Sequence, residues 1–493
     1  MKLCKIFLIL VCICLYASCS NFLDVQPKNV QSEKQLFAAR GGFYTAVNGV
    51  YDKLSSASLY GGNLSYSLVD VIAKCYEPMT SSMYFQALVT ASYSESFIET
   101  QLSSIWREAY NAILNCNVII ENVDKNEGIL SEQEAALIKG EMLAVRACLH
   151  FDMLRLFGPV YKNDPTALSI PYNESSQVSV LPLLPIDSIL EYKILRDLQQ
   201  AERLIEGNDP IIENGPMASL EDDQDVYLRY RQLRFNYYAI LGLMARVYLY
   251  AEDYTNALTY ATKLLNDPKV HEHFPPVDPN KLLANQTNPD RVFSTEVLVG
   301  IYAEDRDNIY TSYFDPAQAG SNLLLPRSYY VSSYLFAGAT QDYRRQSQWE
   351  NATITGMQGR YSFVKYKAIA PPEGEESSRY FYAVLISLIR LSEMYYIAAE
   401  CEPILEDGYD WLNQIRAMRG LTSPLPVISK SDLMDNLRKE YLREFWGEGQ
   451  IFFMFKRLYA DINSNENGWS STTWEASNAY YVLPLPAEEI ANR

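Results

Sequence analysis

The side chains that carry most enzymatic chemistry are sparse in this sequence. Only three histidines occur among 493 residues, so acid–base or triad chemistry built on imidazole has few places to act. The Gly-x-Ser-x-Gly, Walker, dinucleotide-binding and His-Glu-x-x-His signatures do not occur in the sequence. His150 lies in an apolar helical pattern, and His271 and His273 stand just before two prolines. We interpret His150 as a packing residue and the His271 region as a solvated turn, and we expect no metal site and no cofactor.

Carboxylates are plentiful, with 60 acidic residues, so a glycosidase reading has to be weighed. Such an enzyme needs two carboxylates facing each other across a few ångströms. Glu440, Glu444 and Glu448 recur at helical spacing in "KEYLREFWGEGQ", where a structural role in ion pairs is expected. Their expected partners are Arg438, Lys439 and Arg443. We therefore expect no catalytic residues and no enzyme, with a surface glycoside hydrolase that uses another carboxylate pair as the alternative.

Cys19 is the residue with the clearest covalent chemistry. It follows Lys2 and Lys5, an apolar run and the small residues of "YASC", which is the layout of a secretory signal. Small residues directly before a cysteine are typical of bacterial lipoprotein signals, in which that cysteine carries the lipid; Tyr16 stands where such signals usually have leucine. We predict a signal peptide over residues 1–18 and lipidation at Cys19, which would hold the protein beside a membrane through its anchor alone.

The composition of the rest is that of a globular protein. The chain is 48% hydrophobic and 21% charged, with a net charge of −18, which argues against a nucleic acid partner because phosphate binding needs basic patches. Four further cysteines outside the signal are widely separated and lack Cys-x-x-Cys spacing, so they read best as buried apolar residues.

Helices are expected to position whatever site the chain has. Apolar residues recur at intervals of three and four across "SSIWREAYNAILNCNVIIENV" and again across "SEQEAALIKGEMLAVRACLHFDMLRLFGP", which predicts two long helices packed as an antiparallel hairpin. The second begins with a capping box, Ser131 and Glu134, and stops at Gly158 and Pro159.

Two further segments repeat a helical-pair pattern. Small residues in "LGLMARVYLYAEDYTNALTYATKLLNDP" fall at the offsets of a tetratricopeptide repeat, and "RLSEMYYIAAECEPILEDGYDWLNQIRAMRG" resembles a degenerate fourth unit. One pair alone cannot bury its apolar face, so the sequence predicts a mostly α fold, an α-α superhelix of about four such pairs. Long aromatic loops separate the pairs, and "TEVLVGIYA" and "YSFVKYKAI" are expected to form short strands.

These features together resemble the SusD/RagB family of outer-membrane nutrient-uptake lipoproteins from the Bacteroidetes. The resemblance runs along nearly the whole chain. It is carried in order by "CSNFLDVQP", "WREAYNAILNCNVIIENV", "GEMLAVRACLHFDMLRLFGPV", "LGLMARVYLYAEDYTNAL", "QDYRRQ", "RLSEMYYIAAE", "LNQIRAMRGL", "LRKEYLREFWGEGQIFFMFKR" and "YVLPLPAEEI". It implies that residues 19–493 form one SusD-like domain in which inserted loops build a ligand-binding surface.

The resemblance also implies a function and partners. Members bind glycans without cleaving them, sit on the outer membrane facing the cell exterior, and deliver ligand to a SusC-like TonB-dependent transporter. Some members handle peptides, so a peptide or another nutrient is the alternative cargo. A tetratricopeptide adaptor that binds proteins through its concave face is a further alternative.

Glycan binding calls for aromatic faces and polar groups in the loops. Members of the family tend to bind with loops from the first third of the chain and from a later insertion, which here would fall around Tyr310. On this basis we predict stacking and polar contacts from Asn63, Tyr76, Tyr84, Tyr93, Tyr310, Tyr313 and Arg327.

Overall fold

The computed structural model describes residues 33–177, 179–216, 226–284, 288–353, 358–370, 380–463 and 473–491. The predicted signal peptide and Cys19 lie outside these ranges. The helices are α2 (Glu33–Leu36), α3 (Arg40–Leu54), α4 (Leu68–Ile72), α5 (Met83–Val89), α6 (Ser96–Asp124), α7 (Glu132–Phe157), α8 (Ile186–Ile189), α9 (Leu195–Ile205), α10 (Ile211–Asn214), α11 (Tyr237–Tyr250), α12 (Tyr254–Leu265), α13 (Pro268–His273), α14 (Asp307–Ile309), α15 (Tyr343–Gln348), α16 (Leu391–Cys401), α17 (Leu405–Met418), α18 (Lys430–Glu444), α19 (Ile451–Leu458), α20 (Asn478–Tyr481) and α21 (Ala487–Ala491). The strands are β1 (Glu77–Pro78), β2 (Val297–Tyr302), β3 (Leu324–Leu325), β4 (Trp349–Asn351), β5 (Tyr361–Phe363), β6 (Leu385–Arg390), β7 (Ile462–Asn463) and β8 (Thr473–Trp474).

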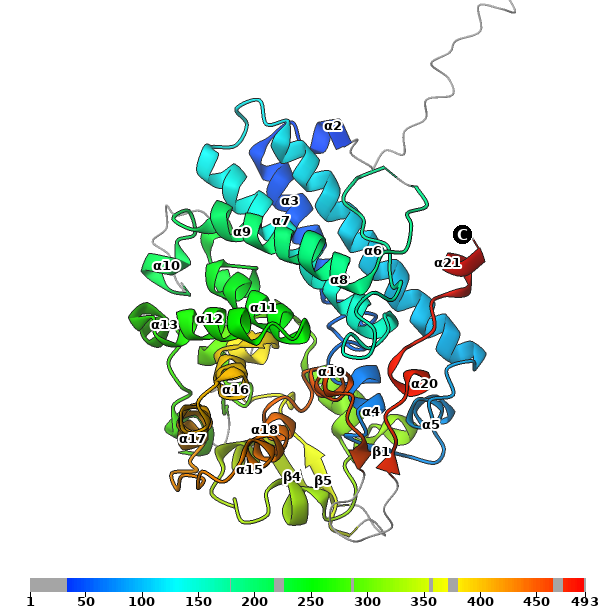
Figure 1. The fold of residues 1–493 in the computed structure, drawn as a ribbon, viewed down its shortest axis with the longest axis vertical. Helices are drawn as coiled ribbons and strands as arrows, with labels where there is room; N and C mark the ends of the chain where they lie inside the picture. The colour runs from blue at the N-terminus through cyan, green and yellow to red at the C-terminus, as the bar shows by residue number, and fades with distance from the viewer. Residues whose placement is uncertain are drawn as a thin grey trace, which may run out of the picture.

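The long helices pack in chain order. Helix α3 lies on α6, α7 lies between α6 and α9, α11 pairs with α12, and α16 packs on both α12 and α17. Figure 1 shows this succession from the blue and cyan helices to the yellow and orange ones. The predicted α-α superhelix of tetratricopeptide-like pairs with a few short strands is confirmed.

The hairpin of α6 and α7 forms as its sequence predicts. The side chain of Ser131 accepts from the Glu134 amide, and the Glu134 carboxylate accepts from the Ser131 amide at 3.0 Å. Close approach on the other side of α7 depends on Gly140, because a Cβ there would lie 2.5 Å from Cγ1 of Ile205 in α9. Two unrelated local signals, a cap and a missing side chain, therefore place α7 at the centre of the first half.

A small antiparallel sheet joins the middle of the chain to the third helical pair. Strand β2 pairs with β6, and β6 runs directly into α16. Gly242 of α11 lets the sheet approach, since a Cβ would meet Ile389 at 3.1 Å and Leu298 at 3.3 Å. The strands predicted in "TEVLVGIYA" and "YSFVKYKAI" correspond to β2 and β5.

A buried ion-pair network ties α15, β6, α17 and α18 together. Glu444 accepts from Arg344 at 2.8 Å and from Arg419 at 2.6 Å, and it also pairs with Arg390. Arg419 reaches further, to Glu296 just before β2. Breaking such a pair strands a charge in a low-dielectric interior, so the network holds the elements in one arrangement.

The expected partners of the glutamate stripe are correct only in part. Arg443 does pair with Glu440, at 2.6 Å. Arg438 instead contacts Asp435, and the ammonium of Lys439 lies over the Tyr334 ring. Helical spacing brings these side chains near one another, but the arginines that bind Glu444 come from distant parts of the chain.

The C-terminal segment crosses back over the first third of the molecule. Figure 1 shows α20 beside α5, with α21 beside α6. The Tyr93 hydroxyl donates to the Tyr480 carbonyl at 3.0 Å, and the Leu483 amide donates to the Leu156 carbonyl at 3.2 Å. Tyr480 and Tyr481 are both buried.

The cysteines of the described ranges are Cys75, Cys116, Cys148 and Cys401, and all four are buried free thiols. Within the described ranges, no helix combines the length and apolar character that crossing a membrane requires.

Candidate functional site

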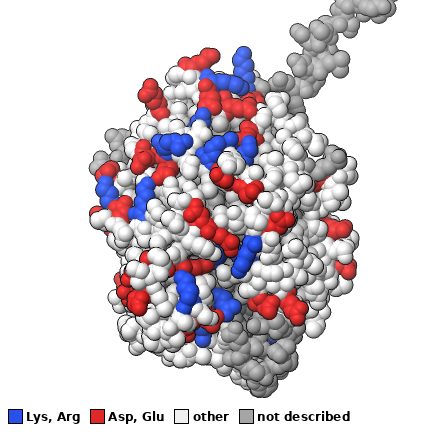
Figure 2. Space-filling view, viewed as in Figure 1, with Lys and Arg blue, Asp and Glu red and all other residues white. Residues whose placement is uncertain are grey.

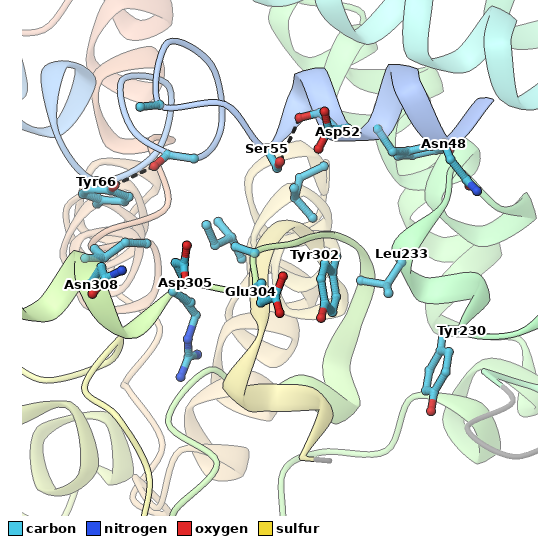
Figure 3. A pocket seen from close by; sticks show the side chains of 18 of the residues that line it. Asn48, Asp52, Ser55, Tyr66, Tyr230, Leu233, Tyr302, Glu304, Asp305 and Asn308 are labelled. Carbon is cyan, nitrogen blue, oxygen red and sulfur yellow. Dashed lines mark hydrogen bonds between the residues drawn. The ribbon is translucent and has the colours of Figure 1, made fainter. Parts of the chain in front are cut away.

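A cavity of about 780 Å³ lies between the C-terminal end of α3 and the segment that follows β2. The loop after α3 closes one side, and residues 229–234 close another. Figure 3 shows Asp52 and Ser55 of the α3 end above Tyr302 and Glu304, with Tyr66 on one side and Tyr230 on the other. The size falls in the range of small-ligand sites.

Two tyrosine rings at the cavity are uncovered. Tyr302 ends β2 and is 47% exposed, and Tyr230 is 40% exposed. Tyr230 has a left-handed backbone (φ 48°) and stacks flat on Phe381, with ring centroids 5.9 Å apart. The ring is therefore fixed by its backbone and by a second ring, which suits a rigid platform for the apolar face of a ligand.

A second pair of rings comes from two loops far apart in sequence. Tyr66 and Tyr313 both line the cavity, with ring centroids 5.5 Å apart. Phe85 of α5 packs edge-on against Tyr313 at 6.3 Å. Burial raises the pKa of Tyr66 and of Tyr313, so both hydroxyls stay protonated at neutral pH. Tyr66 already donates its proton to the Gly61 carbonyl at 2.6 Å, and its oxygen remains an acceptor.

Polar groups surround the rings. Asp52, Glu304 and Asp305 are exposed carboxylates at the cavity. The Oδ1 atom of Asn48 accepts from Arg234 at 2.6 Å, which orients that amide. Carboxylates and an oriented amide can bind hydroxyl groups, and with uncovered rings they form a surface suited to a polyhydroxylated ligand.

Charged side chains outside the cavity are mixed. Figure 2 shows acidic and basic residues interspersed over the face it presents. Among the described residues, no group of three or more His, Cys, Asp or Glu side chains has the arrangement of a metal site.

Comparison with known proteins agrees with the fold. Residues 21–207 match a family described as "Starch-binding associating with outer membrane", and residues 326–492 match the SusD family. The chain belongs to the SusD family. A SusD-like protein, P25 from Formosa agariphila, is 22% identical over 466 residues, which cover 83% of this chain and 80% of the relative.

Solved structures of the SusD superfamily share the architecture. One from Bacteroides thetaiotaomicron superposes with a TM-score of 0.67 at 20% identity, covering 92% of this chain and 98% of the other. The surface glycan-binding protein A of the same organism has a TM-score of 0.61 at 17% identity, covering 92% and 98%. At these identities the likeness establishes the fold.

Within this SusD-family fold, the predicted residues separate into groups. Tyr313 lines the cavity. Tyr84 is half-buried against Phe85, with ring centroids 5.1 Å apart, and Tyr310 is half-buried under the ammonium of Lys367. The structure thus brings the first-third loop and the later insertion together through Phe85 and Tyr313, as the family resemblance implied; the ligand contacts of these residues remain predictions.

Three of the predicted residues are buried. Tyr76 packs against Phe314 and Trp446 and is 3% exposed. Tyr93 is 6% exposed, with its hydroxyl bound to the Tyr480 carbonyl, and Asn63 is also 6% exposed. A stacking or hydrogen-bonding role for them would require neighbouring side chains to move away first.

Arg327 lies at a different, smaller cavity of about 270 Å³. Its guanidinium is 5.8 Å from the centre of the Trp474 ring, which also carries the ammonium of Lys74 at 4.3 Å. Burial, followed by the nearby Arg327 charge, lowers the pKa of Lys74 to about 7. Arg327 and Tyr313 therefore belong to separate sites.

Tyr230 and Tyr302 are the uncovered aromatic residues of the cavity that sequence reasoning missed. Tyr302 stands at the end of an apolar strand pattern, one residue before the charged turn "EDRD". An aromatic residue at such a boundary is a usable signal, because the strand fixes its backbone while the turn leaves its ring uncovered. Tyr230 carries no comparable local signal.

Proposed function

We propose that this SusD-family protein is a non-catalytic glycan-binding lipoprotein of the cell surface. It captures oligosaccharides and delivers them to a SusC-like TonB-dependent transporter in the outer membrane. Residues 19–493 act as one binding domain, held at the membrane by lipid on Cys19 and facing the cell exterior.

One observation carries the glycan part of the proposal. A cavity of about 780 Å³ presents the uncovered rings of Tyr230 and Tyr302 beside carboxylates and the Asn48 amide. Sugar rings have apolar C–H faces that stack on aromatic side chains, and hydroxyl edges that need such polar partners. The family description as starch-binding supports the same class of ligand.

The binding proposal is tested on a soluble protein that begins at Ser20. Isothermal titration against a broad oligosaccharide panel should find a ligand, and Tyr302→Ala should weaken its binding about tenfold, or about 1.4 kcal/mol. Tyr192→Ala is the matched control, since Tyr192 is 61% exposed and does not line the cavity. Binding of peptides with no binding of any oligosaccharide would refute the glycan part.

The remaining parts have separate tests. Incubation with a bound oligosaccharide, followed by product chromatography, should return the ligand intact, and turnover would contradict a non-catalytic role.

The full-length protein isolated from its own membrane should co-purify with a TonB-dependent transporter and carry a lipid that the Cys19→Ala variant lacks.

A further inference from the structure

Arg306 is a buried cation without a hydrogen-bonding partner. It lines the cavity and is 2% exposed, yet its Nε and Nη1 atoms are buried and donate to no acceptor. The guanidinium group of Arg306 lies over the aromatic ring of Tyr366, 5.7 Å from the ring centroid. A buried guanidinium normally has its donors satisfied, because leaving them unmade costs the full desolvation penalty.

The contrast with the other buried arginines is sharp. In the described ranges each of the others contacts a carboxylate; Arg231, Arg246 and Arg419 are examples. The charges of Asp290 and Asp307 act on Arg306, but neither carboxylate forms an ion pair with it, and Asp290 is bound instead to the amide and hydroxyl of Ser294. The other buried arginines of the described ranges thus have a carboxylate in direct contact, whereas Arg306 at the cavity has none.

A second arginine at the cavity shares the feature. Arg229 also lines it, and its Nε atom is buried without a hydrogen-bond acceptor. Arg234 Nη1 also lacks a hydrogen-bond acceptor, but this side chain donates to Asn48 through Nη2 and lies 3.7 Å from Glu141. Buried guanidinium nitrogens without acceptors on Arg306 and Arg229, at one cavity, indicate a missing anionic partner.

The carboxylates of the cavity do not fill this role. Asp52, Glu304 and Asp305 are exposed, so solvent screens their charge. Arg306 lies in a low-dielectric setting, and burial lowers the pKa of its guanidinium to about 10. An anion inside the cavity would interact more strongly with the buried arginine than with the exposed carboxylates.

We propose that Arg306, assisted by Arg229, forms a subsite for an anionic substituent, a carboxylate or a sulfate ester, on a sugar held in the cavity. The planar guanidinium fork matches two oxygens of either group, once the side chains that cover its Nε and Nη1 atoms move aside. The inference rests on the proposed function and narrows it to acidic oligosaccharides, with the uncovered tyrosines stacking on neighbouring sugar rings.

The first experiment uses small probes. Melting of the protein from Ser20 onward is followed with sodium glucuronate, sodium sulfate, glucose and sodium chloride, the salts being compared at equal ionic strength. Glucuronate or sulfate should raise Tm saturably above the chloride value, and Arg306→Gln should abolish the rise. The anion that raises Tm shows which substituent the subsite binds: glucuronate indicates a uronic acid, and sulfate indicates a sulfate ester.

Stability without ligand separates a binding role from a structural one. Arg306→Gln removes an unneutralised charge and should leave Tm unchanged or higher. Arg246→Gln, which breaks a buried pair with Glu393, should lower it. A fall in Arg306→Gln comparable to that in Arg246→Gln, or an anion response that survives in Arg306→Gln, would overturn the subsite.

Oligosaccharides complete the test. For a tetragalacturonate and its methyl ester, or a sulfated galactan tetrasaccharide and its desulfated form, the charged member should bind at least about tenfold more tightly. Arg306→Gln should remove that difference. Equal binding of the charged and neutral forms would count against this inference alone. Failure of the unaltered protein to bind any oligosaccharide would count against the proposed function.

Discussion

His150 shows how a single buried side chain can make the fold sensitive to acid. Its Nδ1 atom lies 2.9 Å from the Arg146 carbonyl, and its Nε2 atom accepts from the Asn173 amide at 3.0 Å. The ring also stacks on Tyr172. Nε2 can accept that hydrogen bond only while the imidazole is neutral. Burial, the largest influence, lowers the pKa of His150 to about 3.

The direction of the pH effect follows from this shift. An unfolded chain binds a proton at His150 near pH 6.5, and the folded protein does not until about pH 3. Stability is therefore full above pH 6.5 and falls as the pH drops below it, by about 2 kcal/mol at pH 5. In urea unfolding at pH 7.5 and pH 5, His150→Gln should lose less stability on acidification than the unaltered protein.

An exposed histidine supplies the control. His271 is exposed, and its ring bonds the Leu265 carbonyl, so His271→Gln is the matched variant that removes a histidine outside the buried core. Parallel profiles for His150→Gln and the unaltered protein would show that this side chain is not the source of the acid sensitivity.

At the scale of elements, helix spacing is set where a side chain is missing. Gly140→Ala would place a Cβ 2.5 Å from Ile205 Cγ1, so α7 and α9 must separate or Ile205 must change rotamer. We expect a loss of about 1–3 kcal/mol, measured by urea unfolding. Gly49→Ala in α3, where nothing lies within 4 Å, should instead add up to about 1 kcal/mol from helix propensity. Stabilisation by both changes would mean that the contact of α7 with α9 is not close-packed.

The elements were the most predictable part of the structure. Apolar spacing and the Ser131 cap define α6 and α7 locally. Small residues in the later pairs indicate where two helices pack closely. Strands β2 and β5 likewise carry their own pattern. The partners of Glu444 could not be predicted, because Arg344, Arg390 and Arg419 reach it only after the superhelix has formed.

The site was predictable only in outline. Loop aromatics from two regions do meet, at Tyr66 and Tyr313. Composition gave no way to separate the uncovered Tyr302 from the buried Tyr76 and Tyr93, since exposure depends on which neighbours the fold supplies. Arg306 could not be predicted either, because what distinguishes it is that its buried Nε and Nη1 atoms have no hydrogen-bond acceptor in the folded protein.

At the scale of the molecule, the C-terminal segment connects the two ends of the superhelix. Tyr480 contacts Tyr93 and Ile72, Leu483 contacts Leu156, and Tyr481 donates to the Ala460 carbonyl after α19. Each large apolar side chain removed from water contributes about 1.5–3 kcal/mol. The segment therefore adds to the direct contacts between α7 and α19, in which Lys456 donates to the Gly158 carbonyl at 2.7 Å and Arg155 donates to Gln450 at 3.1 Å.

Truncation after Ser477 should weaken this coupling. We expect a lower Tm and a broadened or split calorimetric transition, with faster amide exchange in both 140–157 and 451–458. Truncation after Pro486 removes α21, whose described residues are not buried, and should change Tm little. A single unshifted transition after the longer truncation would rule out this coupling.

The same segment sets an order in time. The hydrogen bond between Tyr93 and Tyr480 spans 387 positions, and closing so long a loop in an unstructured chain costs about 5 kcal/mol of entropy. The intervening helices must form first to shorten that loop. Because Tyr480 of α20 follows Ile72 of α4 by 408 positions, the surface of α4 that α20 covers stays in contact with water until all of those positions have been synthesised. Any chaperone that acts on the chain during that time has its first third to protect.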